Sequence, residues 1–335
     1  MLNAFIDGAR RVVAAPTIVI GVYVATLLLS VPLALVVRDA IARDLGDSTA
    51  AGRMADGVDA DWWQEFMGRT DGLAATFRPA VIGFAAPLDN LDTLLDNRPR
   101  ALAIAGATAA YLTLWAFLIG GIIDRYARRR ATRPEGFFVA CGVFFVRFLR
   151  LAIVGGLAYY VLFGHVHGWL LDDLYDRLTH DVTVERTGFQ IRLALYGLFG
   201  LLLGAVNIVI DYAKIRMVVE DRRSAIGAVL AAARFVWRRP RPTLGLYAIN
   251  GLAFLIVLSL YRLVSPGVTA GGLTAAAVVL LGQVYVVTRL MLRLLFHASQ
   301  TALFQRELAH AGYTAAPLPT WPESPAAEAI GIGEP

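Results

Sequence analysis

Long apolar runs dominate the chain, with charged segments between them. Residues 12–37 carry no charged side chain across 26 positions. A helix needs about 20 residues to cross the hydrocarbon core of a bilayer. The run also exceeds the apolar core of roughly 7–15 residues found in a cleavable signal peptide, so we predict an uncleaved anchor. The same reasoning predicts six membrane spans, at residues 12–37, 101–123, about 149–170, 191–210, 243–261 and 271–288.

The amino-acid composition agrees with this pattern. Of the 335 residues, 57% are hydrophobic and 17% are charged, and the mean hydropathy is +0.60. Soluble domains are nearer half apolar and a quarter charged, so the composition excludes a disordered chain, a coiled coil and a water-soluble enzyme. We expect an all-α, polytopic membrane protein with a single transmembrane domain over 1–310, a long outer loop over 38–100 and a flexible cytoplasmic tail over 311–335.

The connecting segments alternate in charge. Segment 38–100 holds eleven acids against seven arginines. Segment 171–190 holds five acids against two arginines. Segment 125–150 holds seven arginines against one acid, and segment 211–242 holds eight Lys or Arg against three acids. Because Lys and Arg are enriched in cytoplasmic loops, we predict that both termini and the two basic segments are cytoplasmic. The two acidic segments are then outside.

The two basic segments share a spacing that indicates an internal repeat. Asp124 precedes Arg147 by 23 residues, and Asp211 precedes Arg234 by 23 residues. Arg10 stands in a similar Ala-Arg-x-Val context to Arg234. Such self-similarity can set a whole fold, although chance similarity among Ala-, Leu- and Arg-rich segments is the alternative. We predict three parallel copies related by an axis along the membrane normal, at roughly 1–124, 135–211 and 222–289.

Each copy is expected to begin with an amphipathic elbow helix on the cytoplasmic surface. Pro16 and Pro240 each follow the repeated arginine by six residues, whereas Ile153 takes that place in the middle copy. We place a separate in-plane helix at 136–148, because Arg147 would be costly in the middle of a bilayer.

The inner helix over 222–239 is basic at both ends and apolar along one face. Such a helix lies in the interface, with its apolar face in lipid and its cations among anionic headgroups. The alternative is an elbow that only joins two spans, because arginine is expected in inner loops in any case. Its apolar face consists of Ile226, Val229, Leu230, Ala233 and Trp237. We predict lipid or phosphate contacts at Arg10, Arg147, Arg234, Arg289 and Arg293.

Few polar side chains fall inside the spans. In lipid, buried amides usually join helices by hydrogen bonds, and a substrate or ion pathway is the alternative. No span has an acidic residue near its centre, which argues against a proton-coupled pump. Asp211, at the inner end of the fourth span, is expected to pair with Arg289 or Arg293. The amides are Asn207, Asn250 and Gln283.

The outer segment 165–181 holds the strongest candidate metal ligands. If residues 171–180 are helical, Asp172, Asp176 and His180 align at i, i+4 and i+8. His and Asp on one face could hold zinc or manganese, as in a membrane enzyme with an externally facing site. Neither HExxH nor CxxC accompanies them, so a solvated interfacial helix is the other interpretation. The five candidates are His165, His167, Asp172, Asp176 and His180.

The remaining motifs separate the classes of function. Cys141 is the single cysteine, so the chain has no internal disulfide and no cysteine cluster. Without a Walker motif, a dinucleotide fingerprint, a nucleophile elbow or a zinc-protease helix, no cofactor is indicated. The basic segments lack the interleaved aromatics of a soluble nucleic-acid-binding domain.

The sequence therefore favours a non-enzymatic protein: a lipid-contacting scaffold, an accessory subunit or a transport-type protein. Anionic headgroups on the cytoplasmic face are its expected partners, and a homo-oligomer or a membrane-protein partner stays open.

Four short segments carry a resemblance to a known family. They are residues 120–128 (GGIIDRYAR), 136–142 (GFFVACG), 211–214 (DYAK) and 220–225 (EDRRSA). At these segments the chain resembles a family of uncharacterised bacterial inner-membrane proteins with six spans, and this resemblance covers nearly the whole chain. It is more distantly similar to the membrane domain attached to some glycerophosphodiester phosphodiesterases, without their soluble catalytic domain. The resemblance implies six helices in a bacterial cytoplasmic membrane and supplies no catalytic residue.

Overall fold

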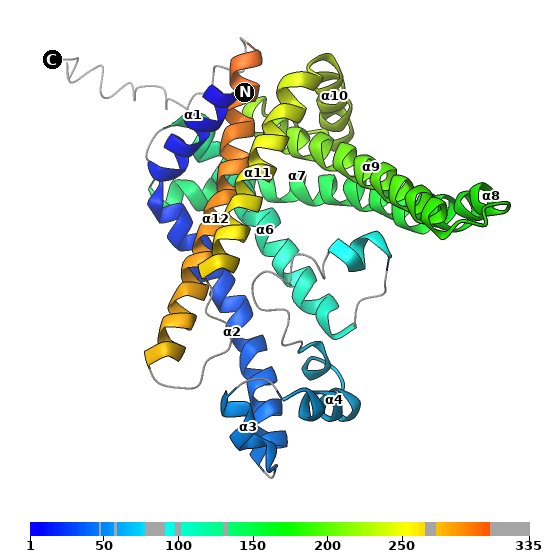
Figure 1. The fold of residues 1–335 in the computed structure, drawn as a ribbon. Coiled ribbons are helices and arrows are strands. Elements are labelled where there is room, and N and C mark those ends of the chain that lie inside the picture. Colours follow the sequence, from blue (N-terminus) through cyan, green and yellow to red (C-terminus); the bar gives the residue numbers. More distant parts are fainter. Residues whose placement is uncertain are drawn as a thin grey trace, which may run out of the picture.

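The computed structural model describes residues 1–46, 48–56, 59–77, 91–97, 102–129, 133–264 and 273–308. Within these residues every regular element is a helix (Figure 1). The all-α membrane fold predicted from hydropathy is confirmed, whereas the predicted tail over 311–335 lies outside the described residues. The segments long and apolar enough to cross a bilayer are Pro16–Gly46, Ala105–Arg128, Pro134–Thr179, Glu185–Val219, Pro240–Val264 and Ala276–Glu307.

The long helices extend beyond the predicted spans. Short helices and two π-helical turns, η3 and η4, lie between them. The helices are α1 (Leu2–Val13), α2 (Pro16–Gly46), α3 (Ala50–Asp56), α4 (Ala60–Arg69), η1 (Ala74–Thr76), α6 (Leu102–Arg128), α7 (Pro134–Val161), η3 (Leu162–Val166), η4 (Trp169–Leu174), α8 (Tyr175–Thr179), α9 (Glu185–Val219), α10 (Ala225–Arg238), α11 (Pro240–Val264) and α12 (Leu273–Glu307).

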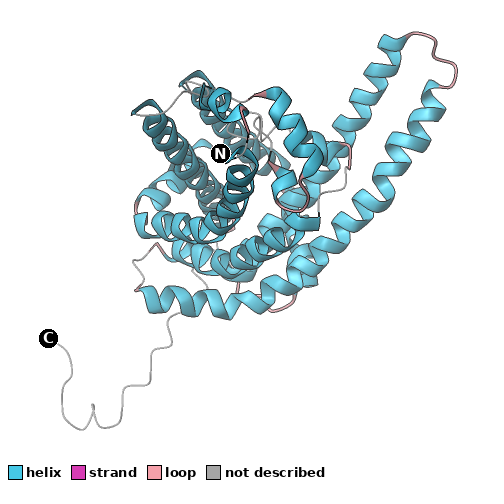
Figure 2. Ribbon diagram, turned by 90° about the horizontal axis from the view of Figure 1, so that it is seen from below, coloured by secondary structure: helices cyan, strands magenta, loops and turns pink. Residues whose placement is uncertain are grey.

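The basic elements gather at one end of the molecule. Figure 1 shows α1, α10 and the C-terminal end of α12 together at the top, with α3 and α4 at the opposite end. We call the end formed by α1, α10 and the C-terminal end of α12 the basic end. Helices α2, α11 and α12 run between the two ends, whereas α7 and α9 lie side by side and extend sideways (Figures 1 and 2). The six long helices therefore include a hairpin that lies across the others.

The separate inner helix predicted at 136–148 is wrong. These residues belong to α7, which is continuous over Pro134–Val161. Where the proposed repeat carries a proline the structure has a break, since α2 begins at Pro16 and α11 begins at Pro240. Proline lacks the N–H that a helix interior needs and is favoured at the first helical position. Ile153 takes that place in the middle copy, and α7 continues through it without a break. The threefold repeat is therefore not supported in its middle copy.

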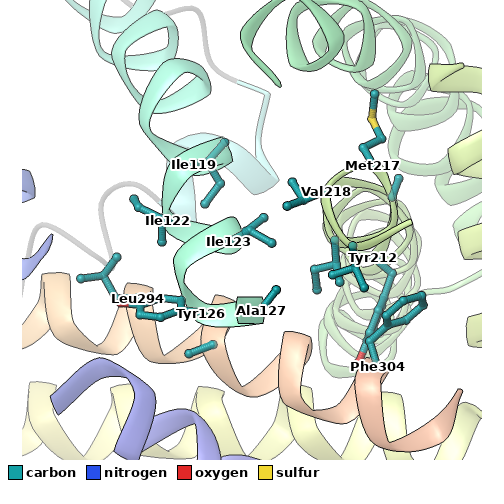
Figure 3. Packing of buried hydrophobic residues seen from close by; sticks show 14 of the residues in the cluster. Ile119, Ile122, Ile123, Tyr126, Ala127, Tyr212, Met217, Val218, Leu294 and Phe304 are labelled. Atoms are coloured by element: carbon teal, nitrogen blue, oxygen red, sulfur yellow. The ribbon is translucent and has the colours of Figure 1, made fainter. Parts of the chain in front are cut away.

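The core forms where α6 meets α9 and α12. Figure 3 shows Ile119 and Ile123 of α6 facing Val218 of α9. Tyr126 and Tyr212, which belong to the two similar sequence segments, are both fully buried here. Each tyrosine is followed by an alanine, Ala127 or Ala213, so the two Tyr-Ala pairs mark two helices that contribute to one core.

Two glycines allow helices to approach closely. A Cβ added to Gly121 of α6 would lie 2.6 Å from Sγ of Cys141 on α7. A Cβ added to Gly8 of α1 would lie 2.6 Å from the backbone nitrogen of Ser299 on α12. Real Cβ atoms essentially never come this close to another atom. Helix α1 is therefore fixed against α12, and α6 against α7.

The first part of the loop over 38–100 has a small core of its own. Asp59 caps α4 by accepting hydrogen bonds from the backbone N–H groups of Asp61 and Trp62, both at 3.0 Å, and Arg53 of α3 also donates to Asp59. Trp62 stacks on Phe66 with ring centroids 5.0 Å apart, and both are buried. This part of the loop is therefore folded.

A second part of the loop over 38–100, residues 91–97, packs on the α7–α9 hairpin. Nδ2 of Asn97 donates a hydrogen bond to the carbonyl oxygen of Phe163 at 3.1 Å. The hydroxyl of Tyr196 on α9 donates to a carboxylate oxygen of Asp96 at 2.5 Å. These contacts tie the loop to the side of the hairpin.

Candidate anion-binding site

A pocket of about 390 Å³ at the basic end is lined by five arginines. It lies between the end of α9, the turn that follows it, α10 and the residue after α12. We call it the arginine pocket. The arginines are Arg216, Arg222, Arg234, Arg238 and Arg239, and the other lining residues are Gly227, Leu230, Ala231, Phe235 and Leu308.

The sequence of α10 explains why its arginines line the pocket. Oγ of Ser224 accepts a hydrogen bond from the N–H of Gly227 at 3.1 Å, so the helix begins with a side-chain cap. A stripe of alanines that ends at Phe235 is buried against the rest of the protein. Gly227, Arg234 and Arg238 follow at i, i+7 and i+11, which places them together on a different face.

Three of the five arginines have carboxylate partners. Glu220 pairs with Arg216 at 3.1 Å and with Arg222 at 2.5 Å. Arg239 pairs with Glu307 of α12 at 2.9 Å. Two carboxylates thus hold three arginines in place around the pocket.

The other two arginines keep their charge available. Arg234 and Arg238 are exposed and form no ion pair with any residue that the structure describes. A guanidinium presents its N–H groups as a planar fork that matches the oxygens of a phosphate. With five guanidinium groups against two carboxylates, the pocket attracts an anion.

The arginines predicted to contact phosphate do not form one site. Arg234 lines the arginine pocket, whereas Arg10 lines a different hollow of about 430 Å³. Arg147 is bonded to Asp221 at 2.5 Å, and Arg289 is exposed on α12. Of the other four arginines of the pocket, Arg222, Arg238 and Arg239 form the basic ends of the predicted inner helix over 222–239. Arg216, in the same basic segment 211–242, was not predicted.

Arg293 makes its contacts inside the protein. Its Cζ atom lies 3.7 Å from the centre of the Trp115 ring and 5.5 Å from that of Tyr111. The guanidinium also donates a hydrogen bond to the hydroxyl of Tyr111. Because a cation is attracted to an aromatic face, Arg293 joins α12 to α6. Arg293 was predicted to contact lipid headgroups. The structure instead places its guanidinium against Trp115 and Tyr111.

Asp211 does not pair with either arginine predicted as its partner. Its carboxylate accepts hydrogen bonds from Lys214 at 2.9 Å and from the hydroxyl of Tyr247 at 2.7 Å. Lys214 is three residues further along the same helix, so it reaches Asp211 whatever the rotation of α12. Arg293 and His297 interact with Asp211 only through longer-range electrostatics.

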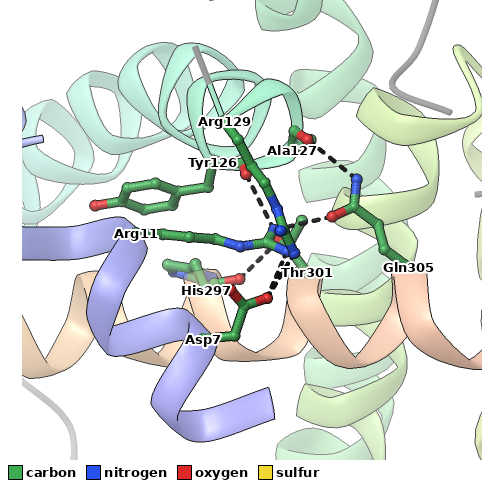
Figure 4. A network of polar contacts seen from close by, with 8 residues as sticks. All are labelled: Asp7, Arg11, Tyr126, Ala127, Arg129, His297, Thr301 and Gln305. Atoms are coloured by element: carbon green, nitrogen blue, oxygen red, sulfur yellow. Dashed lines mark hydrogen bonds and ion pairs between the residues drawn. The ribbon is translucent and has the colours of Figure 1, made fainter. Parts of the chain in front are cut away.

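A second charged network joins α1 to α6 and α12 (Figure 4). The guanidinium of Arg11 donates to the carbonyl oxygen of Tyr126 at 3.0 Å, to Gln305 at 2.9 Å and to Asp7 at 2.9 Å. Asp7 also pairs with Arg129 at 2.7 Å. Burial lowers the pKa of Arg11, and the nearby carboxylate of Asp7 opposes that effect. Arg11 was not predicted as a functional residue, although its spacing of four residues from Asp7 favours an ion pair on a helix.

The His and Asp residues of segment 165–181 do not assemble into a metal site. Among the residues that the structure describes, no three His, Cys, Asp or Glu side chains gather as metal ligands would. His167 instead bonds through Nε2 to the carbonyl oxygen of Leu95 at 2.7 Å. The predicted alignment of Asp172, Asp176 and His180 assumed regular α-helix. The structure has π-helical turns there, which add a residue per turn and rotate the faces. His165, the remaining candidate, is exposed.

The three intramembrane amides join helices, as predicted. Each forms a hydrogen bond with a side chain on a different long helix, which joins the two helices. The bonds run from the Tyr159 hydroxyl to Asn207 at 2.7 Å, from Asn250 to Ser299 at 3.1 Å and from the Tyr23 hydroxyl to Gln283 at 2.9 Å.

The chain was compared with protein-family models, curated proteins and solved structures. The similarity to the bacterial six-span family and to the phosphodiesterase-linked membrane domain stays a prediction that rests on four short segments. The arginine pocket therefore has to be interpreted from its own geometry. No protein-family model, no curated protein and no solved structure matches the chain.

Proposed function

We propose that this polytopic membrane protein is a lipid-contacting scaffold that binds the phosphate groups of anionic lipids in the arginine pocket. The observation that carries the proposal is the pair Arg234 and Arg238, which line the pocket and have no ion-pair partner among the described residues. The three neighbouring arginines are held in place by carboxylates, so the pocket is formed before a ligand arrives.

The exposed apolar face of α10 supports a position at the headgroup boundary. Ile226, Leu230 and Trp237 are 64%, 53% and 88% exposed, and their spacing places them on one side of the helix. A helix with such a face and cationic ends lies in the interface, where tryptophan is enriched. At that depth the arginine pocket is level with the phosphates.

We further propose that the basic end is cytoplasmic and that the membrane is the bacterial inner membrane. The proposal rests on the charge rule for the loops and on the family resemblance. Cysteine labelling tests the sidedness in a Cys141→Ala background. A cysteine at exposed His180 is expected to react with a membrane-impermeant reagent in intact cells. A cysteine at exposed Arg223 is expected to react only after lysis, and the reverse pattern would overturn the orientation.

Lipid binding can be tested by native mass spectrometry of the full-length protein in mild detergent. The protein is offered equal amounts of phosphatidylglycerol and phosphatidylcholine. We expect selective retention of phosphatidylglycerol, and the double variant Arg234→Gln/Arg238→Gln should weaken it. Each juxtamembrane cation contributes about 1 kcal/mol of attraction to an anionic surface, so the double change should lower the affinity about 30-fold.

A matched variant controls for net charge. Arg186 and Arg262 are exposed at the starting end of α9 and the final turn of α11, so Arg186→Gln/Arg262→Gln removes the same charge outside the pocket. Equal losses in the two double variants would contradict the proposal. Inorganic phosphate is offered in parallel to distinguish the two sources of the anion. Displacement of the lipid by phosphate at comparable concentration would assign the pocket to a small soluble anion.

A further inference from the structure

A third hollow, of about 560 Å³, lies between α2 and α6 and is bounded by the start of α7. It shares no lining residue with the arginine pocket. Its walls belong to three of the segments that are long and apolar enough to cross a bilayer. We call it the α2–α6 groove. In a membrane such a groove is filled by something apolar, because water gains few hydrogen bonds there.

Small residues on α2 create the groove. Gly21 and Ala25 line it four residues apart on the same face of the helix. A Cβ added to Gly21 would meet nothing within 4 Å. Larger apolar residues, Leu114 and Phe117 among them, form the α6 wall. The hollow is thus a consequence of missing side-chain volume on one wall.

One charged residue stands among the described residues that line the groove. Arg125, in the last turn of α6, donates a hydrogen bond to the carbonyl oxygen of Ala14 at 3.3 Å. Ala14 lies between α1 and α2, so this bond fixes the guanidinium beside the start of α2. Arg125 forms no ion pair with a described residue, and the adjacent Asp124 is held by Arg128 at 2.8 Å. An apolar groove with one unneutralised cation near its end matches a molecule with an acyl chain and a phosphate.

We propose that the α2–α6 groove binds one phospholipid molecule, with an acyl chain along Gly21 and Ala25 and the phosphate on the guanidinium of Arg125. Both parts of the lipid find a complementary surface. The chain covers apolar side chains, and the phosphate receives a charge-assisted hydrogen bond. This site is independent of the arginine pocket, because the two share no residue.

Photo-crosslinking with a phospholipid that carries a diazirine on one acyl chain tests the proposal. The full-length protein is reconstituted in phosphatidylcholine vesicles with the probe, irradiated and analysed by peptide mass spectrometry. We expect adducts on residues 114–118 of α6. Gly21→Leu fills the groove without a steric clash at Cβ and should remove most of these adducts. Ala25→Leu provides a second variant with the same expected loss.

Gly251→Leu is the matched control, because a Cβ added to this exposed glycine of α11 also meets nothing within 4 Å. It should leave the labelling of 114–118 unchanged. Unchanged labelling in both groove-filling variants, with each eluting as a folded protein, would refute the acyl-chain site.

The phosphate contact has its own test. Arg125→Gln is expected to lower the labelling by the phospholipid probe about fivefold, and to leave labelling by a diacylglycerol probe, which lacks phosphate, unchanged. Equal effects on both probes would exclude a phosphate contact. Arg234→Gln/Arg238→Gln should leave the groove labelled as in the wild type, so this proposal and the proposed function can fail separately.

Discussion

The guanidinium of Arg11 donates a hydrogen bond to the backbone carbonyl of Tyr126, 115 residues further along the chain. Helix α6 ends two residues after Tyr126, at Arg128. A buried side chain of α1 therefore closes the end of another helix, where backbone carbonyls lack partners within their own helix. The same guanidinium reaches α12 through Gln305. Three helices depend on one residue at the basic end.

Replacing Arg11 with methionine should destabilise the protein. The change keeps much of the apolar stem but leaves the carbonyl of Tyr126 buried without its donor, at a cost of about 1–3 kcal/mol. Asp7 retains Arg129 as a partner, which limits the loss. Chemical denaturation in mild detergent measures the change. Arg10→Met, at the adjacent exposed residue, is the control. Similar losses for both variants would mean that the network contributes nothing specific.

Gly8→Ala should separate α1 from α12. The new Cβ would meet backbone atoms of Ser299, which cannot rotate away as a side chain could. Overpacking of this kind costs about 1–3 kcal/mol. At Gly251 the added methyl group meets nothing within 4 Å, and alanine is the better helix former, so Gly251→Ala should be neutral or slightly stabilising. Thermal unfolding of the two variants compares them directly, and a stable Gly8→Ala protein would disprove the close approach.

Arg293→Lys should destabilise the protein although it conserves the charge. The flat guanidinium lies over the Trp115 ring, and an ammonium group is a compact, strongly hydrated charge that does not stack in that way. A desolvated cation–π contact is worth about 2 kcal/mol, and a fraction of it should be lost. Arg289→Lys, one turn earlier on exposed surface, should have no effect on the melting temperature. Equal melting temperatures for Arg293→Lys and Arg289→Lys would show that stacking on Trp115 does not stabilise the protein.

Acid should loosen α4 in the loop over 38–100. The hydrogen bond from Arg53 lowers the pKa of Asp59, and the backbone N–H of Trp62 adds to the effect. A carboxyl group whose pKa is lower in the folded state stabilises that state above its unfolded pKa. The contribution disappears as the pH falls through the folded pKa, which places the loss below about pH 4.

The serine variant isolates this effect. Serine also caps helices but does not titrate, so Asp59→Ser should keep α4 without the acid sensitivity. Hydrogen exchange of α4 is measured for the wild type and for Asp59→Ser at the same pH values. Because the intrinsic exchange rate changes equally with pH in both proteins, their difference reports the stability of α4. Parallel curves for the two proteins would exclude Asp59 as the responsible group.

The sequence predicted features that depend on local chemistry. The six apolar segments follow from length and hydropathy. The breaks at Pro16 and Pro240 agree with the chemistry of proline, although the first span was predicted to begin at residue 12 and α2 begins at Pro16. The amides Asn207, Asn250 and Gln283 were predicted to join helices because lipid offers an amide no other partner. Each of these inferences needs only the residue and its immediate surroundings.

Features that depend on helix rotation and direction were not predictable in this way. The partner of Asp211 and the aromatic surroundings of Arg293 are set by how α6, α9, α11 and α12 are turned relative to one another. Hydropathy gives the length of an apolar helix but not its tilt, which is set by packing. The sideways direction of the α7–α9 hairpin could therefore not be predicted from the hydropathy pattern.

The close packing of α6 on α7 gives the unmodified protein a chemical reporter of its own motion. Cys141, the single cysteine, is fully buried opposite Gly121. A thiol reagent reaches its sulfur only when the two helices separate. If they reclose faster than the reagent reacts, the modification rate measures the equilibrium population of the open form, and otherwise it measures the opening rate itself. A series of reagent concentrations distinguishes the two regimes and gives the free energy of this local opening without an engineered probe.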